Sequence, residues 1–184
     1  LLAEFQSAYP EIPVRLCTSV WAETLAAGAC DLDIRYGDGH WPVPEAIRLT
    51  DPVSIPVCPP GTEFGADPAA TLGMLARRSA IHIMGYESFW ATLAREHALG
   101  ADAPVSTLSA DSSLVALEMV AAGLGVAIVA RDLAAAHRAA GRVTAPPGIE
   151  VAHNQAHYVI LAPGQPARPE ALLFRTFLVN RFAG

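Results

Sequence analysis

The segment from Asp111 to Ala130, DSSLVALEMVAAGLGVAIVA, constrains the fold more than any other part of the chain. Asp111 and the two serines after it are typical N-cap residues. Their short side-chain oxygens can accept hydrogen bonds from the free N–H groups of a first helical turn. From Leu114 to Ala122 only Glu118 is polar, so we expect most of the circumference of this helix to be buried.

A glycine stop and an uninterrupted apolar run follow this helix. Gly123 suits the left-handed residue that ends many helices, and Leu124 is the apolar residue that commonly comes after it. Val126–Ala130 is apolar without alternation, as in a strand that is covered on both faces. The helix, the stop and the buried strand together predict an α/β fold.

The first third of the chain alternates helix and strand patterns. Leu1–Ala8 is predicted to be a helix, Ile12–Cys17 a strand, Trp21–Ala27 a helix and Asp31–Tyr36 a strand. This order predicts parallel strands joined by right-handed crossovers. A leading strand is missing from it, and the helical pattern begins without a cap. We therefore expect the chain to continue upstream of Leu1.

Elements of the same kinds continue to the end of the chain. Strands are predicted at Ile47–Leu49, Val53–Cys58, Ala80–Met84, Val105–Leu108, Arg142–Thr144 and Tyr158–Leu161, and helices at Ala69–Arg77, Glu87–Leu99, Arg131–Ala140 and Pro169–Phe182. Pro56 excludes the second of these strands from the middle of a sheet, so we interpret it as a crossing between two lobes. Lobe I is predicted at residues 1–54 and 159–184, and lobe II at residues 55–158.

Composition restricts the class of protein. The chain has 184 residues, of which 52% are hydrophobic and 16% charged, enough for one sizeable core or two small lobes. A net charge of −6 argues against a surface that neutralises DNA phosphates. Cys17, Cys30 and Cys58 are too few and too widely spaced for a disulfide framework. The chain has no apolar run of about 18 residues and no signal peptide. We therefore expect the three cysteines to be buried thiols in a reducing cytoplasm.

A two-lobed α/β fold binds its ligand in the cleft between the lobes, near strand C-termini and helix N-termini. The residues predicted at such positions are Thr18, Ser19, Arg35, Tyr36, Gly85, Tyr86, Asp111, Ser112 and Tyr158.

Several of these residues have an alternative structural role. Thr18 and Ser19 could cap the next helix, and Gly85 could serve only the geometry of a turn. Arg35 ends an otherwise apolar strand and needs a partner, which is either a ligand or a neighbouring carboxylate, Asp33 or Asp38. His40 and Trp41 could either wall the cleft or anchor their loop.

Asp111 and Ser112 make opposite demands on a ligand. A helix N-terminus offers free N–H groups and partial positive charge to an anion, but a carboxylate beside it repels one. A zwitterionic or amine-bearing ligand whose carboxylate binds Arg35 would satisfy both charges.

Enzyme and metal chemistry are not indicated. The chain contains neither a GxSxG nor an HExxH motif. Gly123 and Gly125 lie between a helix and a strand, whereas a phosphate-binding loop requires a strand and then a helix. His153 and His157 have no cysteine pair to complete a metal site. We therefore expect no catalytic residue, no metal and no cofactor.

Motifs along nearly the whole chain resemble the effector-binding domain of LysR-type transcriptional regulators. They are LLAEFQSAYPEIPVRL, DLDIRYGDGHWP, PVCPP, AAGLGVAIV, GRV and YVIL, in this order. The resemblance implies two Rossmann-like lobes joined by two crossover strands, as in type 2 periplasmic binding proteins. It also implies a small-molecule effector in the cleft, faced by the strand end that carries Arg35.

The resemblance also implies partners. LysR-type effector domains form homodimers or tetramers, with the helix at Leu1–Ala8 in the dimer contact, and DNA is bound by a winged helix-turn-helix that precedes the domain. The DGHWP and YVIL motifs are most similar to the subgroup of glycine-cleavage and β-lactamase activators, although Val43 stands where a glycine often follows the proline. The alternatives are a solute-binding protein of a transport system and an enzyme of the prephenate dehydratase type.

Overall fold

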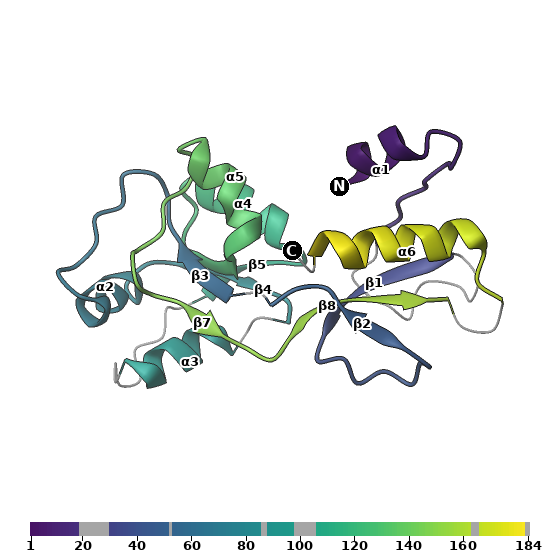
Figure 1. Cartoon of the computed structure of the whole chain (residues 1–184). Coiled ribbons are helices and arrows are strands. Elements are labelled where there is room, and N and C mark those ends of the chain that lie inside the picture. Colours follow the sequence, from purple (N-terminus) through teal and green to yellow (C-terminus); the bar gives the residue numbers. More distant parts are fainter. Residues whose placement is uncertain (19–29, 52, 86–87, 98–105, 163–165, 183–184) are drawn as a thin grey trace. The chain divides into compact units, whose positions relative to one another are not determined.

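The computed structural model describes residues 1–18, 30–51, 53–85, 88–97, 106–162 and 166–182 (Figure 1). The helices are α1 (Leu2–Ala8), α2 (Pro68–Leu75), α3 (Phe89–Glu96), α4 (Ser113–Ala121), α5 (Arg131–Ala139) and α6 (Pro169–Phe182). The strands are β1 (Leu32–Gly37), β2 (Ala46–Arg48), β3 (Val53–Val57), β4 (Ala80–Ile83), β5 (Ser106–Ala110), β6 (Ala127–Ala130), β7 (Val151–Ala152) and β8 (Ala156–Leu161).

The chain divides into two compact units. Unit 1 contains Leu1–Asp51 and Asn154–Gly184, and unit 2 contains Pro52–His153. The predicted lobe boundaries, after residues 54 and 158, would cut through β3 and β8. Each of these strands stays whole because ladder hydrogen bonds tie it to neighbours in one sheet. That the two units are the lobes of a ligand-binding domain stays a prediction at this point.

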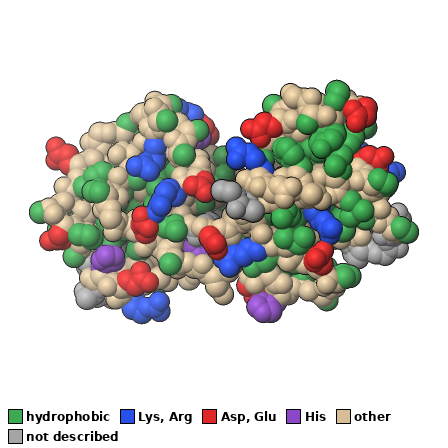
Figure 2. Space-filling view, viewed as in Figure 1, with side chains coloured by type: hydrophobic (Ala, Val, Ile, Leu, Met, Phe, Trp, Pro, Cys, Tyr) green, Lys and Arg blue, Asp and Glu red, His purple; other side chains and the backbone are tan. Residues whose placement is uncertain are grey.

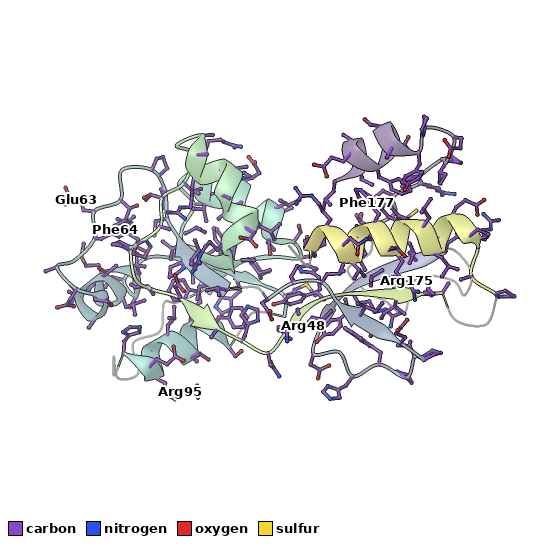
Figure 3. All side chains as sticks on the ribbon, viewed as in Figure 1. Arg48, Glu63, Phe64, Arg95, Arg175 and Phe177 are labelled. Carbon is purple, nitrogen blue, oxygen red and sulfur yellow. The ribbon has the colours of Figure 1, made fainter. Side chains whose placement is uncertain are left out.

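Unit 1 is built on a sheet with the strand order β1-β8-β2, and β8 pairs antiparallel with both neighbours. Leu49, Val159 and Leu178 form its buried core with the partly buried Phe174. Helix α1 is attached to α6 through Phe5, which is fully buried and lies 4.6 Å from the Phe174 ring. Phe177 projects from α6 towards α1 and completes this aromatic cluster (Figure 3).

Two predictions for the beginning of the chain are wrong in the described residues. Residues 13–18 form no strand, and Leu16 is 70% exposed. An alternating pattern forms a strand only where a neighbouring strand and a packed face accept it. The predicted parallel pairing is also absent from the described part of unit 1, because the partner of β1 is β8. The helix predicted at Trp21–Ala27 lies outside the described residues.

Unit 2 combines parallel and antiparallel pairing. Strand β4 pairs parallel with β5 and forms a parallel bridge to Val126, immediately before β6. Strand β3 then pairs antiparallel with β6 on one edge and with β7 on the other. All residues of β6 are buried, which confirms the prediction of a strand covered on both faces.

Strand β3 lies inside the sheet despite its proline, so the prediction from Pro56 is wrong. On the edge away from β6, β7 pairs only with Val53 and Ser54, and pairing resumes at the bridge between Cys58 and Thr144. The Cys58 N–H donates to the Thr144 carbonyl on that edge. Because backbone groups alternate along a strand, the nitrogen of Pro56 faces the same edge, in the gap where no ladder donor is needed.

Helix α4 ends as predicted. Gly123 has a φ of +81°, and its N–H donates to the Val120 carbonyl. The Leu124 N–H donates to the Met119 carbonyl, which completes a Schellman motif. The predicted burial holds for one face only: Leu117 is fully buried, but Leu114 is 57% exposed.

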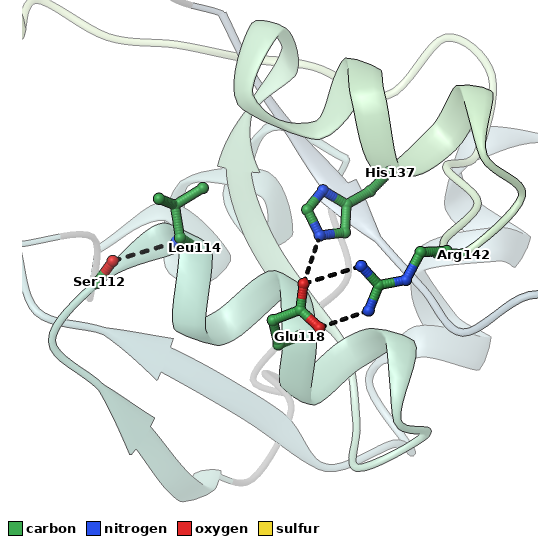
Figure 4. A network of polar contacts seen from close by, with 5 residues as sticks. All are labelled: Ser112, Leu114, Glu118, His137 and Arg142. Carbon is green, nitrogen blue, oxygen red and sulfur yellow. Dashed lines mark hydrogen bonds and ion pairs between the residues drawn. The ribbon is translucent and has the colours of Figure 1, made fainter.

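A polar network attaches α4 to α5 (Figure 4). Arg142 donates from both terminal nitrogens to the Glu118 carboxylate, with a distance of 2.9 Å from Nη1 to Oε1. His137 Nε2 lies 2.9 Å from the same Oε1. These hydrogen bonds, that of Arg142 first, lower the pKa of Glu118 from 4.5 to about 2. The one polar residue in the apolar run of α4 is thus an anchor between helices.

This network predicts a pH-dependent contribution to stability. Because the folded state lowers the pKa of Glu118, the stabilisation is complete above pH 4.5 and is lost as the pH falls towards 2. Glu118→Gln should therefore lower the free energy of unfolding at pH 6, and its difference from the wild type should shrink towards pH 2. Urea denaturation across this range measures the difference, with Glu96→Gln at the exposed end of α3 as the control. A difference that is independent of pH would contradict the assignment.

Candidate functional site

The predicted site residues fall into two groups, one in each unit. Unit 1 contains Thr18, Arg35, Tyr36 and Tyr158, and unit 2 contains Gly85, Asp111 and Ser112. Ser19 and Tyr86 lie outside the described residues.

Arg35 and Tyr158 are brought together by the pairing of β1 with β8. They are direct partners in the antiparallel register, so their side chains lie on the same face of the sheet. The Arg35 Nε donates to the Asp33 carboxylate at 2.6 Å, and the two side chains are only 26% and 18% exposed. The carboxylate partner expected as one alternative for Arg35 is therefore Asp33. Asp38 instead accepts the backbone N–H of His40, which lowers the pKa of Asp38.

The Asp33 pairing leaves part of the guanidinium available. Among the contacts of the described residues, the terminal nitrogens of Arg35 have no carboxylate or carbonyl partner. Two parallel N–H donors in this fork match a carboxylate in geometry and charge. Arg35 is thus oriented by a protein carboxylate and still able to bind a second one.

An aromatic contact that the list of predicted residues omitted lies beside this pair. The Trp41 ring meets the Tyr158 ring edge to face at 5.4 Å, and the Arg35 guanidinium carbon lies 6.0 Å from the Trp41 ring centre. A Cβ at Gly37 would lie 2.7 Å from the Trp41 ring, and one at Gly39 would lie 2.9 Å from the Tyr158 hydroxyl. The feature of the sequence that could have indicated this contact is the pair of glycines, Gly37 and Gly39, shortly before Trp41.

Two predicted residues of unit 1 do not belong to this arrangement. Tyr36 follows Arg35 directly on β1, so its side chain lies on the opposite face, where its ring packs 5.1 Å from that of His157. Thr18 is exposed at the end of the segment that forms no strand. Both were predicted from strand ends without regard to the face or the pairing.

The predicted residues of unit 2 lie at neighbouring strand ends. The Met84 N–H, at the end of β4, donates to the Ala110 carbonyl at the end of β5, so Gly85 and Asp111 continue from adjacent positions. Gly85 has a φ of +86° with open space around its missing side chain. The turn alone therefore requires a glycine there.

Ser112 caps α4. Its hydroxyl accepts the Leu114 N–H at 3.2 Å (Figure 4), while Asp111 is exposed immediately before it. One orphan N–H of the first turn is thereby satisfied, and the partial positive charge of the helix end remains beside the Asp111 carboxylate.

Charge and metal-binding potential are limited in the described part of the chain. Acidic and basic side chains are interspersed on the face seen in Figure 2. The described residues contain no group of three or more His, Cys, Asp or Glu side chains that could hold a metal ion. In the same residues, no helix is both long and apolar enough to cross a bilayer.

The sequence is similar to curated transcriptional regulators. It is 28% identical over 183 residues to the glycine cleavage system transcriptional activator of Escherichia coli K12, covering 99% of this chain and 59% of that protein. It is 25% identical to the HTH-type transcriptional activator AmpR of Rhodobacter capsulatus, covering 99% and 61%. The chain thus spans about 60% of the length of these curated relatives. They are regulators rather than enzymes or solute-binding proteins, so the two alternatives from the sequence are not favoured.

Solved structures agree with this placement. The effector domain of AmpR from Pseudomonas aeruginosa superposes with a TM-score of 0.82 at 26% identity, covering 99% of this chain and 86% of that one. The LysR-type regulator CrgA of Neisseria meningitidis shares the fold at 19% identity, with a TM-score of 0.76 and coverage of 100% and 63%. These neighbours have the two-lobed fold of periplasmic binding proteins, so the predicted fold class is confirmed. Since the model of the family described as "LysR substrate binding domain" also matches residues 1–183, the chain belongs to that family.

Proposed function

We propose that this chain is the ligand-sensing part of a cytoplasmic LysR-type transcriptional regulator. It binds a small molecule and catalyses no reaction, and the full protein binds DNA through a winged helix-turn-helix outside these residues. The observation that carries the proposal is the oriented Arg35 guanidinium beside Tyr158 and Trp41, in a domain of this family. The functional lobes of this sensor are the two units.

The charges favour a zwitterionic ligand with an amino-acid-like head group. Asp33 already balances the charge of Arg35, and Asp111 adds a negative charge where α4 begins. Within unit 1, the terminal nitrogens of Arg35 favour the carboxylate of such a ligand. Within unit 2, the Asp111 carboxylate favours an ammonium group and disfavours a second anion. The Tyr158 hydroxyl in unit 1 and Ser112 in unit 2 are further polar groups beside these charges.

A thermal-shift screen tests the role of Arg35. The probes are glycine, other amino acids, short peptides and small carboxylates, because a ligand that binds only the folded state raises the melting temperature. A ligand at 100 times its Kd stabilises by about 2.7 kcal/mol. We expect Arg35→Gln to abolish the shift, because a charge-assisted hydrogen bond from the partly buried guanidinium to the carboxylate is lost. Arg168→Gln, at an exposed arginine of the same unit, is the control. An unchanged shift in Arg35→Gln would remove Arg35 from the site.

The role of Asp111 is tested by calorimetry with matched ligands. Asp111→Asn should weaken binding of amine-bearing ligands about 10- to 150-fold, since a hydrogen bond to a charged group contributes about 1.5–3 kcal/mol. Binding of matched analogues that lack the amine should be unchanged or stronger. Asp132→Asn, in the first turn of α5, controls for the loss of one negative charge. If every amine-bearing ligand keeps its affinity for Asp111→Asn, the zwitterion hypothesis fails.

In the full protein we propose that this chain forms a homodimer or tetramer, with α1 in the dimer contact. The ligand then shifts the equilibrium between two assembly geometries, which it can do only by binding one of them more tightly. Small-angle scattering of the full-length protein should therefore differ with and without saturating ligand. Identical scattering curves would leave this mechanism without support.

A further inference from the structure

A second arginine lies in the same row of side chains as Arg35 and Tyr158. In the sheet order β1-β8-β2, Tyr158 is the register partner of Arg35 on one side and of Arg48 on the other. Direct partners project from the same face of a sheet, so the three side chains form a row across it. Neighbouring strands are about 4.8 Å apart, so the backbones of the two arginines are about 10 Å apart. The whole row belongs to unit 1.

The direction of the strands brings this row to one end of the sheet. Strands β1 and β2 both run antiparallel to β8, so they have the same direction. Arg48 is the last residue of β2 (Figure 3), and Arg35 lies near the end of β1. Ligands of α/β folds commonly bind beside the carboxyl ends of strands. Arg48 therefore lies at the same end of the sheet as the carboxylate-binding nitrogens of Arg35.

Arg48 is oriented in the same manner as Arg35. Its Nε donates to the Thr50 carbonyl at 3.1 Å, and its Nη2 binds the Asp51 carboxylate. Among the contacts of the described residues, Nη1 of Arg48 has no carboxylate or carbonyl partner. Each arginine of the row is thus held by groups close to it in the chain and keeps a donor for another oxygen.

The two ion pairs of the row differ in how easily they are exchanged. The side chains of Arg48 and Asp51 are 47% and 86% exposed, so solvent screens their attraction and the pair contributes little to stability. Asp33, beside Arg35, is much less exposed. A carboxylate that arrives from solution can therefore replace Asp51 on Arg48 at little cost, while Asp33 continues to hold Arg35.

We propose that Arg48 binds a second carboxylate of the ligand, which makes acidic amino acids the ligand class of this site. The inference rests on the proposed ligand-sensing function, because it assigns the first carboxylate to Arg35. An acidic amino acid keeps the zwitterionic head group and adds a carboxylate for Arg48. Tyr158 stands between the two arginines in the row and offers its hydroxyl to either carboxylate. Asp51 occupies Arg48 in the absence of ligand and competes with the second carboxylate.

Calorimetry of the full-length protein with matched pairs of ligands tests the proposal. The pairs are aspartate and asparagine, glutamate and glutamine, and homoglutamate and homoglutamine, because the members of each pair differ only in the second carboxylate. The wild type should bind the acid of at least one pair about tenfold more tightly than the amide. Arg48→Gln should lower the affinity for that acid to the affinity for the amide, and should leave the amide unaffected. Asp51→Asn should bind the acid more tightly, because the competing carboxylate is removed.

Arg181→Gln is the matched control, because Arg181 forms a similarly exposed ion pair with Glu4 on α6 and should keep the preference of the wild type. The proposal is overturned if the wild type prefers the acid in none of the pairs, if Arg48→Gln keeps the preference, or if Asp51→Asn binds the acid less tightly. In each of these cases, binding of the amide that disappears in Arg35→Gln would leave the proposed function intact. If no ligand of any pair and no probe of the thermal-shift screen binds, both proposals fail.

Discussion

Unit 1 depends on the pairing of β8 with β1 and β2. Strand β8 is the central strand of its sheet, yet it follows unit 2 in the chain, so the contact between Thr50 and His157 joins residues 107 positions apart. Non-local contacts of this kind are slow to form because the loop must close first. Unit 2 shortens that loop when it folds, since its ladder pairs Val53 with Ala152. The neighbourhood of Arg35 and Tyr158 in unit 1 is thus a product of the long-range pairing of β8.

One face of helix α4 packs into the core of unit 2, and polar residues lie at its N-terminus and on another face. Leu117 is fully buried in the core of unit 2, while Ser112 caps the first turn and Glu118 binds α5. Its N-cap, its glycine stop and the buried strand after it were predicted from the sequence because these signals act within a few residues. The exposure of Leu114 was not predicted, because the apolar run does not show which face of the helix lacks a neighbour.

The candidate site was predicted in part. Arg35 and Tyr158 were identified as strand-end residues, but only the register of β8 shows that they are partners on one face. The same register places Tyr36 on the other face. Trp41 became part of the site through two glycines that let its ring and that of Tyr158 approach the backbone. Such close approaches depend on the path of a loop, which no residue pattern in the chain specifies.

Taken alone, the sequence determined the α/β class, the cap and stop of α4, the buried strand β6 and the family to which the chain belongs. Each of these follows from local pattern, short-range capping or ordered motifs. Only the tertiary structure decided which strands pair, that β3 accommodates Pro56 inside a sheet, and that residues 13–18 form no strand. It also decided that Thr50 meets His157. Strand pairing joins residues distant in the chain, and its free energy belongs to both partners, so one segment's pattern does not specify it.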